Sequence, residues 1–173
     1  MNIKKPIRVI LTSPDLCGKT NIAAELSRVT GVPTYKSGRE HSLFHVKDAQ
    51  YNILKYAVYE QLQIVSLCNL SIIFDRFFPC EFVYSKVYHR NSDDTLVLSY
   101  DSWWNELGGK IVFLDKPEMD GDDELIAASK YQEIRTLYDK YKKLTTCKHI
   151  TIDTSDYNLI NQVNTILEFL QSD

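Results

Sequence analysis

Five short apolar runs, most of them rich in β-branched residues, recur along this chain, and segments with helical periodicity separate them. Short runs of this kind predict buried strands, whereas apolar residues spaced three and four apart predict helices. Strands that alternate with helices form parallel sheets with right-handed crossovers. We therefore predict an α/β fold, a five-stranded parallel sheet with helices on both faces. The predicted strands are residues 7–12, 34–36, 71–74, 111–114 and 149–152.

Helical segments are expected after each of these strands, and glycines mark the ends of two of them. The first helix should stop at Gly31, and the fourth should stop at the pair Gly108 and Gly109. A polar, turn-rich segment from residue 116 onward predicts a loop before the fifth helix. Ligands of such sheets bind beyond the carboxyl ends of the strands, so the residues at those ends are the first candidates for function. Beyond the first, the predicted helices cover residues 49–68, 81 onward, 96–107, 125–141 and 159–170.

Length and composition favour one soluble globular domain over residues 1–173. Hydrophobic residues make up 44% and charged residues 25% of the chain. The formal net charge of -3 provides no general attraction to a polyanion, so a phosphate ligand must be held by a local site. The four cysteines lack metal-binding or disulfide spacing, which predicts free thiols. Without a signal-like start or a membrane-length apolar run, we expect a cytoplasmic protein.

Residues 13–20, which read SPDLCGKT, lie between the first strand and the first helix, where a phosphate-binding loop belongs. Backbone N–H groups from Ser13 through Cys17 and Gly18 can surround a nucleotide's phosphates at the helix N-terminus. Lys19 can add a cation near the β- and γ-phosphates, and the Thr20 hydroxyl can bind Mg²⁺. Ser13 occupies the position of the usual first glycine. The alternative interpretation is a plain helix start that binds no nucleotide.

A second polar pair follows the third strand. Asp75 can hold a water molecule of Mg²⁺, and Arg76 can present a bidentate donor to an acceptor phosphate. An isolated pair of this kind is usually a surface ion pair. Its occurrence together with the loop at residues 13–20 favours a catalytic role for both.

The two motifs resemble those of thymidylate kinase, and most closely those of the small thymidylate-kinase-like deoxynucleotide kinases of bacteriophages. The loop SPDLCGKT matches the family's GxDxxGKT form, which places Asp15 on the carboxylate that contacts the sugar 3′-hydroxyl. Cys80 replaces the family's usual serine, and residues 150–155 are similar to its last strand and adenine-side loop. The family's Asp-Arg-Tyr motif and its downstream aromatic correspond to Asp75, Arg76, Phe77 and Tyr84.

The resemblance implies a P-loop kinase three-layer sandwich with a short lid at about residues 116–130, a homodimer, and ATP and Mg²⁺ as cofactors. It implies transfer of phosphate to dTMP or an analogue, in the host cytoplasm if the chain is phage-encoded. Arg39 corresponds to the family's arginine for the acceptor phosphate. Tyr56 and Tyr59 correspond to its base-stacking aromatic, with core packing as the alternative. Arg135 and Thr154 are the candidates on the donor side, and Arg135 is otherwise a surface charge.

The sequence also departs from the family. Leu16 follows Asp15, and residues 116–130 contain no arginine, so the family's catalytic arginine has no counterpart. Residues 55–60 lack the arginine of the substrate-side helix, which leaves the base open. Three rival functions therefore remain: a deoxynucleoside kinase with Glu40 as general base, a kinase acting on a modified base in DNA, and a nucleotide-binding protein without catalysis.

Overall fold

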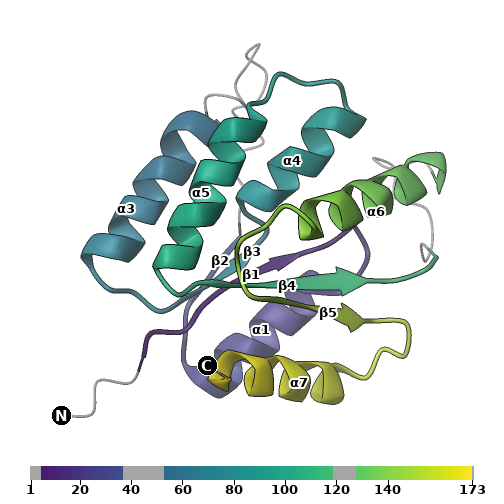
Figure 1. The fold of residues 1–173 in the computed structure, drawn as a ribbon. Coiled ribbons are helices and arrows are strands. Elements are labelled where there is room, and N and C mark those ends of the chain that lie inside the picture. Colours follow the sequence, from purple (N-terminus) through teal and green to yellow (C-terminus); the bar gives the residue numbers. More distant parts are fainter. Residues whose placement is uncertain (1–4, 37–52, 119–127, 173) are drawn as a thin grey trace.

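The computed structural model describes residues 5–36, 53–118 and 128–172. Their five strands form one parallel sheet in the order β2-β3-β1-β4-β5 (Figure 1). This arrangement confirms the predicted α/β fold. The strands are β1 (Arg8–Thr12), β2 (Thr34–Lys36), β3 (Ile72–Asp75), β4 (Lys110–Asp115) and β5 (His149–Asp153).

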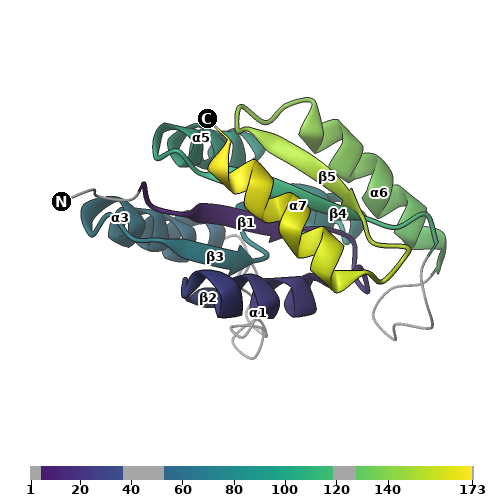
Figure 2. The ribbon, with the colours of Figure 1, turned by 90° about the horizontal axis from the view of Figure 1, so that it is seen from below.

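Helices cover both faces of the sheet. Figures 1 and 2 show α1 and α7 on one face and α3, α4, α5 and α6 on the other. The helices are α1 (Lys19–Thr30), α3 (Tyr59–Leu67), α4 (Phe78–Val87), α5 (Asp94–Glu106), α6 (Ala128–Lys142) and α7 (Leu159–Gln171). A π-helix, η2 (Ile53–Val58), runs directly into α3. No helix within the described ranges is both long and apolar enough to cross a bilayer.

Two helices differ from the prediction. The single helix expected at residues 49–68 is a π-helix followed by an α-helix in its described part, and residues 49–52 lie outside the described ranges. Helix α4 begins at Phe78, three positions before the expected start, because Pro79 fits the first turn of a helix, where its missing N–H costs nothing. The four cysteines are all in the described ranges and all free, as predicted.

The central strand β1 is buried along its whole length, since both of its faces meet the core. Ile10 packs in the cluster beneath α3, α4, α5 and α6, whereas Val9 and Leu11 pack in the cluster beneath α1 and α7. Alternate side chains of a strand point to opposite faces, so a strand between two helical layers needs apolar residues throughout. This explains why the sequence shows a continuous apolar run there.

Strand order brings three strand ends together at one edge of the sheet. Leu11 of β1 is in register with Asp75 of β3, and Lys36 of β2 is in register with the same aspartate. The backbone N–H of Arg76 donates to the Leu11 carbonyl at 3.0 Å, which continues the pairing past the end of β3. The loop after β1 and the polar residues after β3 therefore lie side by side.

Candidate active site

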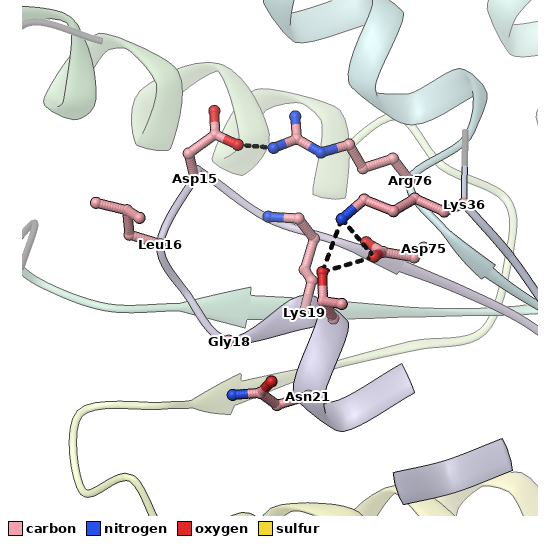
Figure 3. A pocket seen from close by; sticks show the side chains of 9 residues that line it. Asp15, Leu16, Gly18, Lys19, Asn21, Lys36, Asp75 and Arg76 are labelled. Carbon is pink, nitrogen blue, oxygen red and sulfur yellow. Dashed lines mark hydrogen bonds and ion pairs between the residues drawn. The ribbon is translucent and has the colours of Figure 1, made fainter. Parts of the chain in front are cut away.

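A polar pocket of about 290 Å³ lies at the carboxyl ends of β1, β2 and β3, beside the N-terminus of α1. Figure 3 shows its lining side chains. Three of them are basic and two are acidic, although the whole chain carries a net negative charge. A local excess of positive charge is what a phosphate-binding pocket needs in such a chain. The lining residues are Asp15, Leu16, Gly18, Lys19, Thr20, Asn21, Lys36, Asp75 and Arg76.

The loop before α1 curves because two of its residues adopt left-handed backbone conformations. Gly18, the N-cap of α1, has φ 75°, and Leu16 has φ 62°. Glycine adopts this conformation at little cost, whereas leucine pays roughly 1 kcal/mol or more. There is open space at the position of a Gly18 Cβ atom, so the backbone angle and not crowding requires glycine there. Leu16 turns its side chain outward, away from the cluster of charged groups (Figure 3).

Lys19 is buried inside the curve of this loop. Its Nζ donates to the Ser13 hydroxyl at 2.6 Å and to the Pro14 carbonyl at 2.8 Å. Burial lowers the pKa of the ammonium group from its usual value. Ser13, which replaces the usual glycine, therefore places a hydroxyl in contact with this lysine.

Thr20 and Asp75 meet across the pocket. The Thr20 hydroxyl donates to Asp75 Oδ2 at 2.9 Å, and Asp75 Oδ1 is buried without a hydrogen-bond partner among the described residues. Magnesium in nucleotide enzymes takes one or two such oxygens and completes its shell with water and phosphate oxygens. The two residues thus fit Mg²⁺ chemically. The described residues contain no group of three or more His, Cys, Asp or Glu side chains that could hold a metal.

Arg76 and Tyr84 both reach Asp15 of the loop. The guanidinium group forms an ion pair with one carboxylate oxygen, and the Tyr84 hydroxyl donates to the other at 2.8 Å. The guanidinium carbon also lies 5.4 Å from the centre of the Tyr84 ring. Burial raises the pKa of the Tyr84 phenol, so it stays protonated and remains a donor to Asp15. The structure therefore brings together three predicted residues that lie up to 69 positions apart.

A second group of predicted residues lies at the ends of β4 and β5. Arg135 of α6 donates to both oxygens of Asp115, at 2.8 and 2.9 Å, and lowers the pKa of that carboxyl. The backbone N–H and the hydroxyl of Thr154 both donate to the Asp115 carbonyl. Cys17 of the loop before α1 contacts α6 nearby, because its Sγ lies 3.4 Å from the hydroxyl of Tyr131.

Three predicted residues lie away from the pocket. Phe77 is buried in the core, its ring stacks on Phe74 with 3.9 Å between centroids, and it does not line the pocket, so its substrate contact stays a prediction. Tyr56 is 58% exposed and Tyr59 is 46% exposed, so core packing, the alternative interpretation of these two tyrosines, is excluded. Arg39 and Glu40 lie outside the described residues.

Three lining residues, Leu16, Asn21 and Lys36, were not predicted as site residues, and Lys36 is the charged one among them. Lys36 is the last residue of β2, and its Nζ donates to the Thr20 hydroxyl at 3.0 Å. The available signal was its position at a strand end, which is the same signal that singled out Asp75. Its charge alone did not distinguish it from the other surface lysines.

Comparisons with solved structures show which known proteins share this fold. No family model matches the sequence, and a search of curated proteins found no match either. The YorR protein of Bacillus subtilis, solved in complex with phosphorylated GDP, is 18% identical with a TM-score of 0.68, covering 94% of this chain and 95% of that one. Deoxyadenosine kinase from M. mycoides with bound dATP is 19% identical with a TM-score of 0.63, covering 96% and 100%.

Thymidylate kinase from Candida albicans is a further structural neighbour. It is 15% identical with a TM-score of 0.64, and the match covers 96% of this chain and 92% of that one. At such low identity the likeness establishes the fold. The chain therefore has the α/β fold of the P-loop nucleotide kinases.

Proposed function

We propose that the protein transfers the γ-phosphoryl group of ATP to a deoxynucleoside monophosphate, with dTMP or an analogue as the favoured acceptor. One observation carries the proposal. Lys19, Thr20, Asp75, Arg76 and Asp15 come from two separate stretches of the chain and gather around one pocket at a helix N-terminus. Phosphoryl transfer requires groups of these kinds: cations that bind the phosphates, oxygens that fit Mg²⁺, and a hydrogen-bond donor to the acceptor phosphate.

On the donor side, the backbone N–H groups at the start of α1 and the Lys19 ammonium bind the β- and γ-phosphates. Thr20 and Asp75 are the residues that would hold Mg²⁺, and the bound ion would neutralise charge on the phosphate oxygens. The cluster of Asp115, Arg135 and Thr154 lies on the side where the resemblance predicts adenine, beyond the ends of β4 and β5.

On the acceptor side, Arg76 binds the acceptor phosphate and Asp15 accepts a hydrogen bond from the sugar 3′-hydroxyl. The ion pair between these residues holds both side chains at one place in the pocket (Figure 3). An acceptor phosphate is already an oxyanion, so positioning and charge neutralisation suffice and no general base is needed.

A deoxynucleoside kinase is the second candidate, favoured by the similarity to M. mycoides deoxyadenosine kinase over almost the whole chain. Its acceptor is a 5′-hydroxyl, which benefits from a general base to remove the proton. In that case the Arg76 guanidinium would have no acceptor phosphate to bind. The two candidates therefore differ in the phosphorylation state of the acceptor.

The test is ADP release from MgATP with matched panels of deoxynucleosides, their monophosphates and modified DNA. We expect the fastest release with a monophosphate. Lys19→Met should lower kcat by roughly 10²-fold or more, because it removes a cation from the transferring phosphates. Lys143→Met, at an exposed lysine just after the end of α6, is the matched control and should leave the rate unchanged. Faster release with a nucleoside favours the second candidate, and an unaffected Lys19→Met variant excludes the phosphate loop.

A further inference from the structure

Lys36 covers the oxygens that fit Mg²⁺. Its ammonium group donates to Thr20 Oγ1 at 3.0 Å and lies 3.7 Å from Asp75 Oδ2 (Figure 3). The Asp75 side chain is only 4% exposed, whereas the Lys36 side chain is 49% exposed. A side chain from the solvent side of β2 therefore supplies the positive charge that neutralises a buried carboxylate.

Lys36 and a metal ion would compete for the same groups. The Thr20 hydroxyl uses its proton to donate to Asp75 and one of its two lone pairs to accept from Lys36. A metal bound through Thr20 would use the other lone pair, so two cations would lie close to the same oxygen and the same carboxylate and would repel each other. Lys36 has a flexible stem and a half-exposed side chain, so it can withdraw while its backbone stays fixed in β2.

The other cations around the site pair with groups other than Thr20 and Asp75. Arg76 is paired with Asp15, Arg135 is paired with Asp115, and Lys19 is held by the phosphate loop. No arginine occurs in residues 116–130 to supply charge from a lid. Among the described residues that line the pocket, Lys36 is thus the basic side chain whose only partners are the two groups that fit the metal.

We propose that Lys36 is exchanged for Mg²⁺ at the Thr20–Asp75 pair and then acts as a catalytic cation on the transferring phosphoryl group. The second step rests on the proposed function. In it, an acceptor oxygen bonds to the γ-phosphorus, the bond to the β,γ-bridging oxygen breaks, and its electron pair leaves with ADP. The ammonium group gives up no proton and neutralises charge on the phosphoryl oxygens, as an arginine does in related reactions.

The exchange is tested on nucleotide-free protein by titrating Mn²⁺ and detecting the bound ion by electron paramagnetic resonance. Lys36→Met should bind Mn²⁺ roughly tenfold or more tightly than wild type, because the competing charge-assisted hydrogen bond is gone. Lys36→Arg keeps the competitor and should bind Mn²⁺ as wild type does. Adding Asp75→Asn to Lys36→Met should abolish the gain. A Lys36→Met variant with wild-type Mn²⁺ affinity overturns the proposal.

The catalytic role is tested by steady-state kinetics at saturating Mg²⁺. Lys36→Met should lower kcat by roughly 10²-fold and change KM for ATP little, since the charge acts on the transferring group. Lys36→Arg should recover most of the loss, and the exposed control Lys143→Met should resemble wild type. A Lys36→Met variant with the wild-type kcat overturns the catalytic role.

The Mn²⁺ titration and the kinetic assay together distinguish a failure of this proposal from a failure of the proposed function. If wild type releases no ADP with any acceptor, the proposed function and the catalytic role of Lys36 both fail. Tighter Mn²⁺ binding by Lys36→Met would then still support the exchange. If wild type is active and Lys36→Met matches it in both assays, only the role of Lys36 fails.

Discussion

Arg76 has a left-handed backbone with φ 70°, an uncommon conformation for a residue with a side chain. The conformation costs roughly 1–2 kcal/mol and is maintained by the contacts on either side. Before it, Asp75 ends β3, and after it, Phe77 turns its ring into the core against Phe74. The turn between them leaves the guanidinium group directed toward Asp15 (Figure 3). Packing of Phe77 thus helps to position Arg76, although Phe77 itself does not line the pocket.

Glu81 on α4 shows how burial controls a single ionisable group. Its side chain is 16% exposed, one oxygen lacks a partner among the described residues, and the other lies 3.3 Å from Arg90. Burial raises the pKa of this carboxyl to about 7, partly offset by the charges of Arg90 and Lys86. The ion pair is therefore too weak to outweigh the cost of removing the carboxylate from water.

This raised pKa predicts a pH dependence of stability. In the unfolded chain the carboxyl loses its proton near pH 4.5, whereas in the folded protein it keeps the proton until about pH 7. The folded state therefore loses stability as the pH rises through this window, by up to ~3 kcal/mol. Urea unfolding at pH 5 and pH 8 should show this loss in wild type and not in Glu81→Gln. The exposed control Glu168→Gln should lose as much stability as wild type between the two pH values. If Glu81→Gln also lost as much as wild type, the raised pKa would be contradicted.

Among the elements, α5 is joined to the connection between α6 and β5 through one buried carboxylate. Asp101 is fully buried and accepts hydrogen bonds from Tyr141, Thr145 and Thr146 at 2.5 to 2.8 Å. The cluster also raises the pKa of Tyr141 by burial and by its proximity to Asp101, so that this tyrosine remains a donor. These contacts set where β5 begins and hence the edge of the sheet.

Asp101→Asn should destabilise the fold without affecting the pocket. The asparagine amide nitrogen would direct its two N–H groups at the hydroxyl and backbone N–H groups that donate to the aspartate. Buried hydrogen bonds would be lost, which lowers the free energy of unfolding by ~2–4 kcal/mol. Urea denaturation measures the loss, and Asp139→Asn on the exposed face of α6 is the control. Nucleotide binding at low temperature should be unchanged, because Asp101 does not line the pocket. A stability equal to that of the control would show that the carboxylate contributes nothing.

At the scale of the whole molecule, the pocket joins the carboxyl ends of three neighbouring strands, from the edge strand β2 through β3 to the central strand β1, and the N-terminus of α1. A ligand bound by all of these elements stabilises the folded chain as a unit, because it binds only when they are assembled. Ligand binding and global unfolding should therefore be coupled in this protein.

The coupling predicts a rise in Tm with MgATP. At a ligand concentration 100 times Kd the stabilisation is ~2.7 kcal/mol, which corresponds to a shift of roughly 5–10 °C for a chain of this size. Differential scanning fluorimetry can measure it, with adenosine as a control that lacks phosphates. Lys19→Met should lose most of the shift. A wild-type Tm that does not respond to millimolar MgATP would argue against nucleotide binding at this pocket.

The sequence by itself determined the order of the elements, the type of most of them, and the two motifs at the ends of β1 and β3. These features depend on local patterns: apolar periodicity, helix stops, and polar residues that directly follow a strand. The α/β sheet and the meeting of Asp15, Asp75 and Arg76 were predictable for this reason. Only the tertiary structure decided that Lys36 joins them, because that depends on β2 lying beside β3.

Tertiary structure also decided which way the remaining side chains face. Phe77 follows the Asp-Arg motif, yet the left-handed backbone of Arg76 directs the Phe77 ring into the core. Tyr56 and Tyr59 lie at a transition from π-helix to α-helix and are exposed. The pattern of one segment indicates which of its residues are apolar. It does not indicate the orientation that neighbouring elements impose on that segment and its side chains. Those rotations are set by packing between residues far apart in the chain, and a single sequence does not display them.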